Sequence, residues 1–242
     1  MGSASMTAKS LLGFTTLMLL VFAVLVGLGI WQIERLHWKQ GLIAEIEARS
    51  KGAPIALKDA TAMVREGRDP SYYRVRVSGR LDHTKERYLF TVSAERTGWD
   101  VITPLTTADG EIVLVDRGFV PDTLKDPSTR PDGEIEGPVS VTGIVRLPAT
   151  QGLFVPNNEP EANRWFWRDL NAMVQSMFAG QAAELAPFFL EAEKGEVPGH
   201  WPEGGQTRLD LPNNHLQYAI TWFVLAAAIL ILYGVYVFRA RR

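Results

Sequence analysis

The chain has 242 residues, no cysteine, and a formal net charge of −2 from 25 basic and 27 acidic side chains. Without thiols it has no disulfides, no thiolate copper site and no haem attached through a Cys-x-x-Cys-His motif. The mixed, nearly balanced charge also gives no basic footprint for nucleic acid.

Two uncharged apolar stretches lie near the ends of the chain, at Leu11–Trp31 and Tyr218–Phe238, each 21 residues long. As α-helices they would be about 31 Å long, close to the roughly 30 Å hydrocarbon core of a bilayer. Backbone inside hydrocarbon must satisfy its own hydrogen bonds, so both stretches are predicted to be transmembrane helices. Residues 32–217 between them are predicted to form one domain outside the membrane.

The charges in the short segments that flank the two apolar stretches predict how the chain is oriented in the membrane. Residues 1–31 carry only Lys9, and residues 218–242 carry Arg239, Arg241 and Arg242 and no acid. Because short basic flanks stay in the cytoplasm, both termini are expected to be cytoplasmic and residues 32–217 periplasmic. A mitochondrial transit peptide would be longer and rich in arginine, so the short segment before the first apolar stretch favours a bacterial cell inner membrane over an organelle. The length of the first apolar stretch favours an uncleaved membrane anchor over a cleaved signal peptide.

The domain between the spans begins helical and then becomes β-rich. Helix-forming residues extend the first helix over 35–49, and Gly52-Ala53-Pro54 is expected to end it. A short helix is predicted at Leu57–Arg65. From Tyr73 apolar and polar residues alternate, which indicates strands with one buried face. Strands are predicted at Tyr73–Leu81, Arg87–Val92, Trp99–Leu105, Glu111–Val120, Val139–Leu147 and Ala186–Ala192, with a helix at Asp169–Phe178 and a loop at Glu193–Leu211.

Turn residues between these strands predict antiparallel neighbours rather than β-α-β units. The fold class expected is a membrane protein with two transmembrane helices flanking a β-rich (α+β) barrel- or sandwich-like domain. The segments Val75–Gly79 and Val139–Gly143 share the pattern Val-x-Val-Ser/Thr-Gly. Either a duplicated hairpin or chance explains that pattern.

No catalytic constellation stands out, so an enzyme is not expected. None of the four histidines lies in a Ser-His-Asp-like or His-Glu-x-x-His motif. Met173 and Met177, four residues apart on the predicted helix, could bind copper, but they suit core packing better.

Among the four histidines, His215 is a candidate metal ligand because of its position, three residues before the second apolar stretch. A neutral imidazole there could bind a metal through one nitrogen while a hydrogen bond holds the other. Alternatively this is simply a polar helix start, capped by Asn213 or Asn214. His37, six residues beyond Trp31, would lie at a similar depth and is either a second haem ligand or a solvated interfacial residue.

Arg117 lies in the segment Val115–Pro121, between apolar positions at the end of a strand. Its guanidinium could pair with a carboxylate, either an acidic side chain or a ligand propionate. A surface pair with the adjacent Asp116 is the alternative.

Four stretches share their order and spacing with one family. They are Leu28–Lys39 (Leu-Gly-Ile-Trp-Gln-Ile-Glu-Arg-Leu-His-Trp-Lys), Val115–Pro121, Pro156–Pro160 with Asn163, Trp165, Arg168 and Asp169, and Asn213–Phe223. In these stretches the chain resembles the surfeit locus 1 protein family, the assembly factors of cytochrome c oxidase.

The resemblance implies a role when haem a enters the catalytic subunit of the oxidase, with haem a bound transiently. It places His215 at the position of the axial ligand of the haem iron and gives His37 no role. Trp31, Trp38, Tyr218 and Trp222 would pack the macrocycle, or would simply form an interfacial belt. Arg35 or Arg117 would contact the propionates. The expected partners are the catalytic subunit, with haem a synthase and other assembly factors as further candidates.

Two other functions remain open. A scaffold or chaperone would hold the immature catalytic subunit open without touching haem, and it would not need His215. A membrane-anchored sensing or binding module is the third alternative, and the short predicted tails argue against it.

Overall fold

The computed structural model describes residues 8–93, 96–179, 184–195, 197–207, 209 and 211–240. The chain divides into two compact units. One unit combines the chain up to Glu45 with the chain from Asp210 onward. It contains most of the first helix and all of the last helix. The other spans Ile46–Leu209 and contains the sheet.

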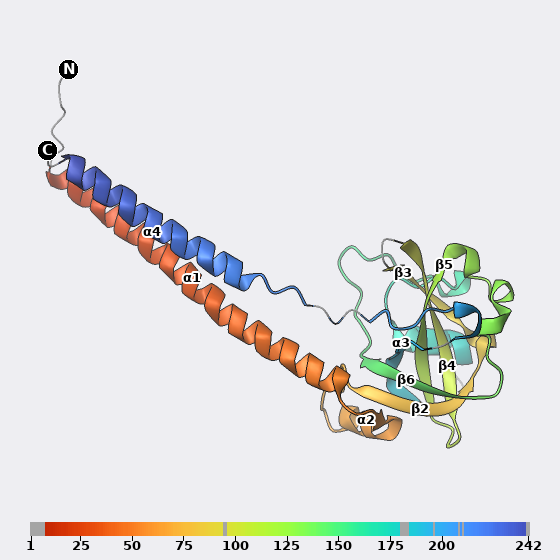
Figure 1. Ribbon diagram of the computed structural model, residues 1–242. Helices are drawn as coiled ribbons and strands as arrows, with labels where there is room; N and C mark the ends of the chain where they lie inside the picture. Colours follow the sequence, from red (N-terminus) through yellow and green to blue (C-terminus); the bar gives the residue numbers. More distant parts are fainter. Residues whose placement is uncertain are drawn as a thin grey trace. The chain divides into compact units, whose positions relative to one another are not determined.

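The first unit is a pair of long antiparallel helices, α1 (Ala8–Lys51) and α4 (His215–Ala240), which lie side by side in Figure 1. Both are long and apolar enough to cross a membrane. The hydroxyls of Thr15 and Tyr233 are 2.6 Å apart near one end of the pair. Further along, a Cβ on Gly29 would lie 2.6 Å from the Phe223 ring, so the glycine permits this close approach. The two expected apolar helices are confirmed.

The first helix continues well beyond its apolar stretch and ends at Lys51, just before Gly52, as predicted. Its last turns belong to the second unit. There Ile46 is buried, and Arg49 donates a hydrogen bond to the Ser71 carbonyl at 3.2 Å. The guanidinium also lies 5.2 Å from the centre of the Tyr73 ring. These contacts fasten the end of the helix to the segment that enters the sheet.

The second unit is built on one sheet whose strand order is β1-β2-β6-β7-β5-β4-β3, with an additional pairing of β2 with β4. That extra pairing closes β2, β6, β7, β5 and β4 into a ring, so the domain is a barrel rather than a sandwich (Figure 1). The strands are β1 (Ile55–Ala56), β2 (Arg74–Leu81), β3 (Arg87–Ser93), β4 (Arg96–Thr107), β5 (Ile112–Pro121), β6 (Pro138–Arg146) and β7 (Leu185–Ala192).

Two short helices cover the barrel, α2 (Leu57–Arg65) and α3 (Leu170–Phe178). Buried side chains of α2 pack against the barrel interior, where Val75, Val113 and Phe188 are fully buried. Residues Met173 and Met177 of α3 pack with Trp165 and Phe189 in a second apolar cluster. Both methionines are therefore core residues, because their side chains are buried among apolar groups.

The expectation of antiparallel neighbours holds for most pairs and is wrong for two. Strand β7 pairs parallel to β5, and the short β1 pairs parallel to β2. The strand order explains the first case, because β7 lies between β6 and β5 and is antiparallel to β6. Since β6 itself runs opposite to β5, β7 must run parallel to β5.

The repeated Val-x-Val-Ser/Thr-Gly segments are direct antiparallel partners, with Val77 opposite Val141 at their centre. Each glycine lies where its strand meets a third strand. A Cβ on Gly79 would lie 2.3 Å from the Thr106 carbonyl of β4, and one on Gly143 would lie 2.5 Å from the Glu191 carbonyl of β7. The glycines are thus needed for ring closure.

We expect Gly79→Ala to destabilise the barrel by about 1–3 kcal/mol, because the new methyl group would collide with backbone that has no room to move. The matched control is Gly195→Ala, where the nearest atom to an added Cβ is 4.0 Å away. Thermal unfolding of the full chain in detergent, followed by tryptophan fluorescence, measures both. Equal midpoints for the two variants would contradict this account of closure.

Candidate functional site

His215 is the first residue of α4, and its Nδ1 lies 2.7 Å from Oε1 of Gln32 on α1. Gln32 is 9% exposed, and His215 is half-buried. The hydrogen bond therefore engages Nδ1 of the imidazole. Nε2 is the ring nitrogen that this bond does not use. Sequence reasoning expected a partner for the imidazole and missed Gln32. The sequence did contain a signal for this partner, because Gln32 is a polar residue directly after the first apolar stretch.

The aromatic residues predicted around His215 remain exposed on the same unit. The Arg35 guanidinium lies 5.7 Å from the Trp31 ring centre and 5.3 Å from that of Trp38. Both rings are about half exposed, at 47% and 58%. At about 100° per residue, these three side chains lie roughly 60–120° around α1 from Gln32, all to one side. They form a cationic and aromatic strip beside the Gln32–His215 contact.

On α4, Tyr218 is exposed and Trp222 is half-buried. The carbonyl of Asn214, the residue before α4, accepts a hydrogen bond from the Tyr218 N–H at 3.2 Å. The Oδ1 atom of Asn213 is buried and has no hydrogen-bond partner among the described residues. His37 is exposed on α1.

Arg117 lies in the other unit and is buried, with 7% of its side chain exposed. Its Nη1 donates to Glu86 Oε1 at 2.8 Å, and its Nη2 donates to the Gly133 carbonyl. The acidic partner left open by the sequence is therefore Glu86, and Asp116 does not pair with it. A propionate would have to displace Glu86, so Arg35 is the better placed of the two candidate arginines.

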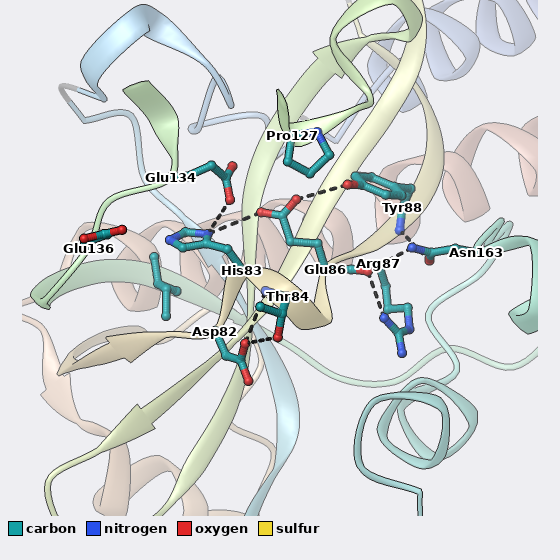
Figure 2. Close-up of a pocket in the computed structure, with 11 residues that line it drawn as sticks. Asp82, His83, Thr84, Glu86, Arg87, Tyr88, Pro127, Glu134, Glu136 and Asn163 are labelled. Atoms are coloured by element: carbon teal, nitrogen blue, oxygen red, sulfur yellow. Dashed lines mark hydrogen bonds and ion pairs between the residues drawn. The ribbon is translucent and has the colours of Figure 1, made fainter. Parts of the chain in front are cut away.

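Glu86 is the centre of this buried network, which we call the Glu86 network: His83, Glu86, Arg117, Arg130 and Glu134. Figure 2 shows the His83 ring facing the carboxylates of Glu134 and Glu86, at 2.9 and 3.4 Å. Burial opposes the charge on His83, but hydrogen bonds to the two glutamates outweigh it and raise its pKa to about 9. Burial likewise opposes the charge on Glu86, but His83, Arg130 and Arg117 lower its pKa to about 2.

The side chains of His83, Glu86 and Glu134 could hold a metal by distance alone, since their ligand atoms lie within 4.8 Å of one another. Their charges argue against it. A protonated imidazole has no lone pair for a metal, and Arg117 and Arg130 already neutralise both carboxylates. The Glu86 network is thus a closed set of ion pairs.

A second buried cluster centres on Arg168, which reaches Asp116 at 2.8 Å and Glu191 at 2.7 Å. Asp100 lies 4.0 Å away, and its Oδ1 has no partner among the described residues. Burial and the nearby charge of Asp116 raise the pKa of Asp100 to about 8. Asp116 also has a raised pKa, because burial outweighs its contact with Arg168.

Asparagines of the third motif stretch fold the long loop onto the barrel. Asn158 Oδ1 accepts the backbone N–H of Phe166 at 2.8 Å. Asn163 Oδ1 accepts the Trp165 indole N–H at 3.2 Å, and its amide donates to the Glu86 carbonyl at 2.9 Å. These residues hold the fully buried Trp165 against β3.

We expect Asp100→Asn to remove a pH-dependent loss of stability. A carboxyl whose pKa is raised in the folded state contributes stability that is fully present below about pH 4 and is lost as the pH rises through about 8. The variant should therefore gain roughly 1–3 kcal/mol relative to wild type at pH 8, and less at pH 5. Denaturant unfolding at both pH values measures this, with the exposed Asp109→Asn as control. An equal difference at both pH values would contradict it.

Comparison with known proteins identifies the family. The SURF1 family model matches residues 19–227. Surfeit locus protein 1 of Xenopus tropicalis is 41% identical over 229 residues, which cover 88% of this chain and 72% of that protein. The protein of the same name from Homo sapiens is 41% identical, with 87% and 73% covered, and a SURF1-like protein of Drosophila melanogaster is 34% identical, with 87% and 73% covered. The chain belongs to the SURF1 family, the cytochrome c oxidase assembly factors that its four motifs resemble.

Proposed function

We propose that this protein assists assembly of cytochrome c oxidase by binding haem a transiently through His215 and passing it to the catalytic subunit. The observation that carries the proposal is the hydrogen bond of 2.7 Å between His215 Nδ1 and Gln32 Oε1. It orients a half-buried imidazole at the end of an apolar helix pair and leaves Nε2 to bind iron.

The residues beside His215 fit such a cargo. Haem a is a flat, apolar molecule that carries two propionates, so a carrier needs aromatic surface and a cation close to the imidazole. Trp31 and Trp38 supply exposed rings, and Arg35 is already stacked on both. An arginine can pair with a carboxylate through two hydrogen bonds. Tyr218 and Trp222 would extend the aromatic surface along α4.

One histidine held by a neutral amide suits transient rather than permanent binding. A second strong ligand or a covalent link would make release to the catalytic subunit slow. The protein would act as a carrier rather than an enzyme, with haem a as cargo. Haem a synthase and other assembly factors are candidate partners before the transfer, and the catalytic subunit is the partner that receives the haem.

We also propose that both termini lie in the cytoplasm and that the barrel is periplasmic, in a bacterial inner membrane. The antiparallel pairing of α1 and α4 supports the placement of both ends on one side. The basic side chains near those ends support the cytoplasmic side.

The scaffold alternative remains distinct, because it needs the barrel surface and does not need His215. One feature is compatible with it: Leu153 and Phe154 are 95% and 97% exposed on the loop before the third motif's asparagines. Exposed apolar residues of this kind often contact a partner. The carrier is favoured because His215, Arg35 and the exposed rings of Trp31 and Trp38 are grouped on one unit, as a haem cargo requires.

We expect the full-length protein, purified from cells that make haem a, to carry a haem a absorption band that His215→Ala removes or shifts. The loss follows because alanine offers no lone pair to iron. The matched control is His37→Ala, an exposed histidine of α1 that should leave the band unchanged. Oxidase assembly in a strain lacking the wild-type protein should fail with His215→Ala and proceed with His37→Ala.

Absence of haem from the wild type, together with normal oxidase assembly by His215→Ala, would rule out the carrier and leave the scaffold. A band that persists in His215→Ala would mean that another residue binds the iron.

A further inference from the structure

Gln32 is a buried polar side chain at an interface where apolar or small residues would be expected. Three residues before it on the same face of α1 lies Gly29, which admits the Phe223 ring. On α4, His215 begins the matching stripe, followed four residues later by Ala219, which is 1% exposed. The glutamine and the histidine therefore close one end of the contact between the two helices, 183 residues apart in sequence.

We propose that Gln32 is a positioning residue that fixes His215 in the tautomer with its proton on Nδ1, so that Nε2 is the atom that binds iron. This inference rests on the proposed carrier function and adds how the ligand atom is chosen.

A carbonyl oxygen carries no proton, so a hydrogen bond between Gln32 Oε1 and His215 Nδ1 requires an N–H on Nδ1. In neutral imidazole the other nitrogen then holds the lone pair. A neutral histidine in water carries its proton mainly on Nε2. Without Gln32, His215 would therefore mostly present an N–H where iron needs a lone pair.

The surroundings strengthen this effect. Gln32 as a residue is only 9% exposed, and a hydrogen bond in a weakly polar interior is electrostatically stronger than one in water. The same bond fixes the ring plane of His215. Losing the partner of a metal-binding histidine typically weakens metal binding by about 10–100-fold. Gln32 should therefore influence both which nitrogen binds and how tightly.

The first test needs no haem. Nitrogen NMR of the imidazole rings in the full-length apoprotein, reconstituted in lipid, distinguishes a protonated from an unprotonated ring nitrogen. We expect His215 to show a protonated Nδ1 and an unprotonated Nε2 in the wild type. Gln32→Leu should move the proton to Nε2. The control is Gln40→Leu, an exposed glutamine two turns further along α1 that should change nothing.

The second test uses haem a. We expect Gln32→Leu to weaken haem a binding by about 10–100-fold. In Gln32→Glu, a carboxylate pulls harder on the Nδ1 proton, so the imidazole becomes a stronger donor and the midpoint potential of the bound haem should fall below that of the wild type. The glutamate variant keeps a hydrogen-bonding side chain, so it tests the idea even if leucine disturbs the helix pair.

The inference is overturned if wild-type His215 carries its proton on Nε2, or if Gln32→Leu leaves both the tautomer and the haem affinity unchanged. Because the tautomer is measured without haem, these outcomes are separate from failure of the proposed function. If the wild type shows the expected tautomer but binds no haem a, the carrier function falls, and with it the role of Gln32 in binding iron.

Discussion

The antiparallel pairing of two apolar helices from opposite ends of the chain is the constraint on which the proposed haem site depends. Apolar side chains gain little by leaving lipid for another helix, so close packing and polar contacts must hold such a pair together. Gly29 and Ala219 supply the close packing. The Thr15–Tyr233 contact lies towards one end and Gln32–His215 at the other. Under the proposed function, the polar contact that stabilises the pair would also orient His215 for the haem iron.

The barrel depends on a different interaction, the pairing of buried charges. The second and third motif stretches, separate in sequence, meet where Arg168 contacts Asp116 at 2.8 Å. Beside them Arg117 is satisfied by Glu86 inside the Glu86 network. Removing one partner of such a pair leaves an uncompensated buried charge and typically costs about 3–5 kcal/mol. We therefore interpret Asp116, Arg117 and Arg168 as residues that stabilise the barrel unit rather than as a binding surface.

The four family motifs divide accordingly between two tasks. The first and fourth meet at Gln32 and His215 in the helix pair, next to exposed aromatic rings and Arg35. The second and third meet in the barrel unit, where the Asp116–Arg168 ion pair joins them and Trp165 is fully buried. The first and fourth motifs place an imidazole, an arginine and exposed aromatic rings on one unit. This grouping is why the carrier function is proposed for the helix pair.

The sequence by itself determined the elements, because helix and strand periods are local. Both apolar helices, the extension to Lys51, helix α2 and most strand positions follow from spacing alone. Candidate residues on one helix, such as Trp31, Arg35 and Trp38, could also be grouped from their spacing. What tertiary structure decided was every contact between distant segments: the ring closure through β2 and β4, the parallel pairing of β5 with β7, and the partners Glu86 and Gln32. A local pattern shows which face of an element is buried, but it does not show which distant residue will lie against that face.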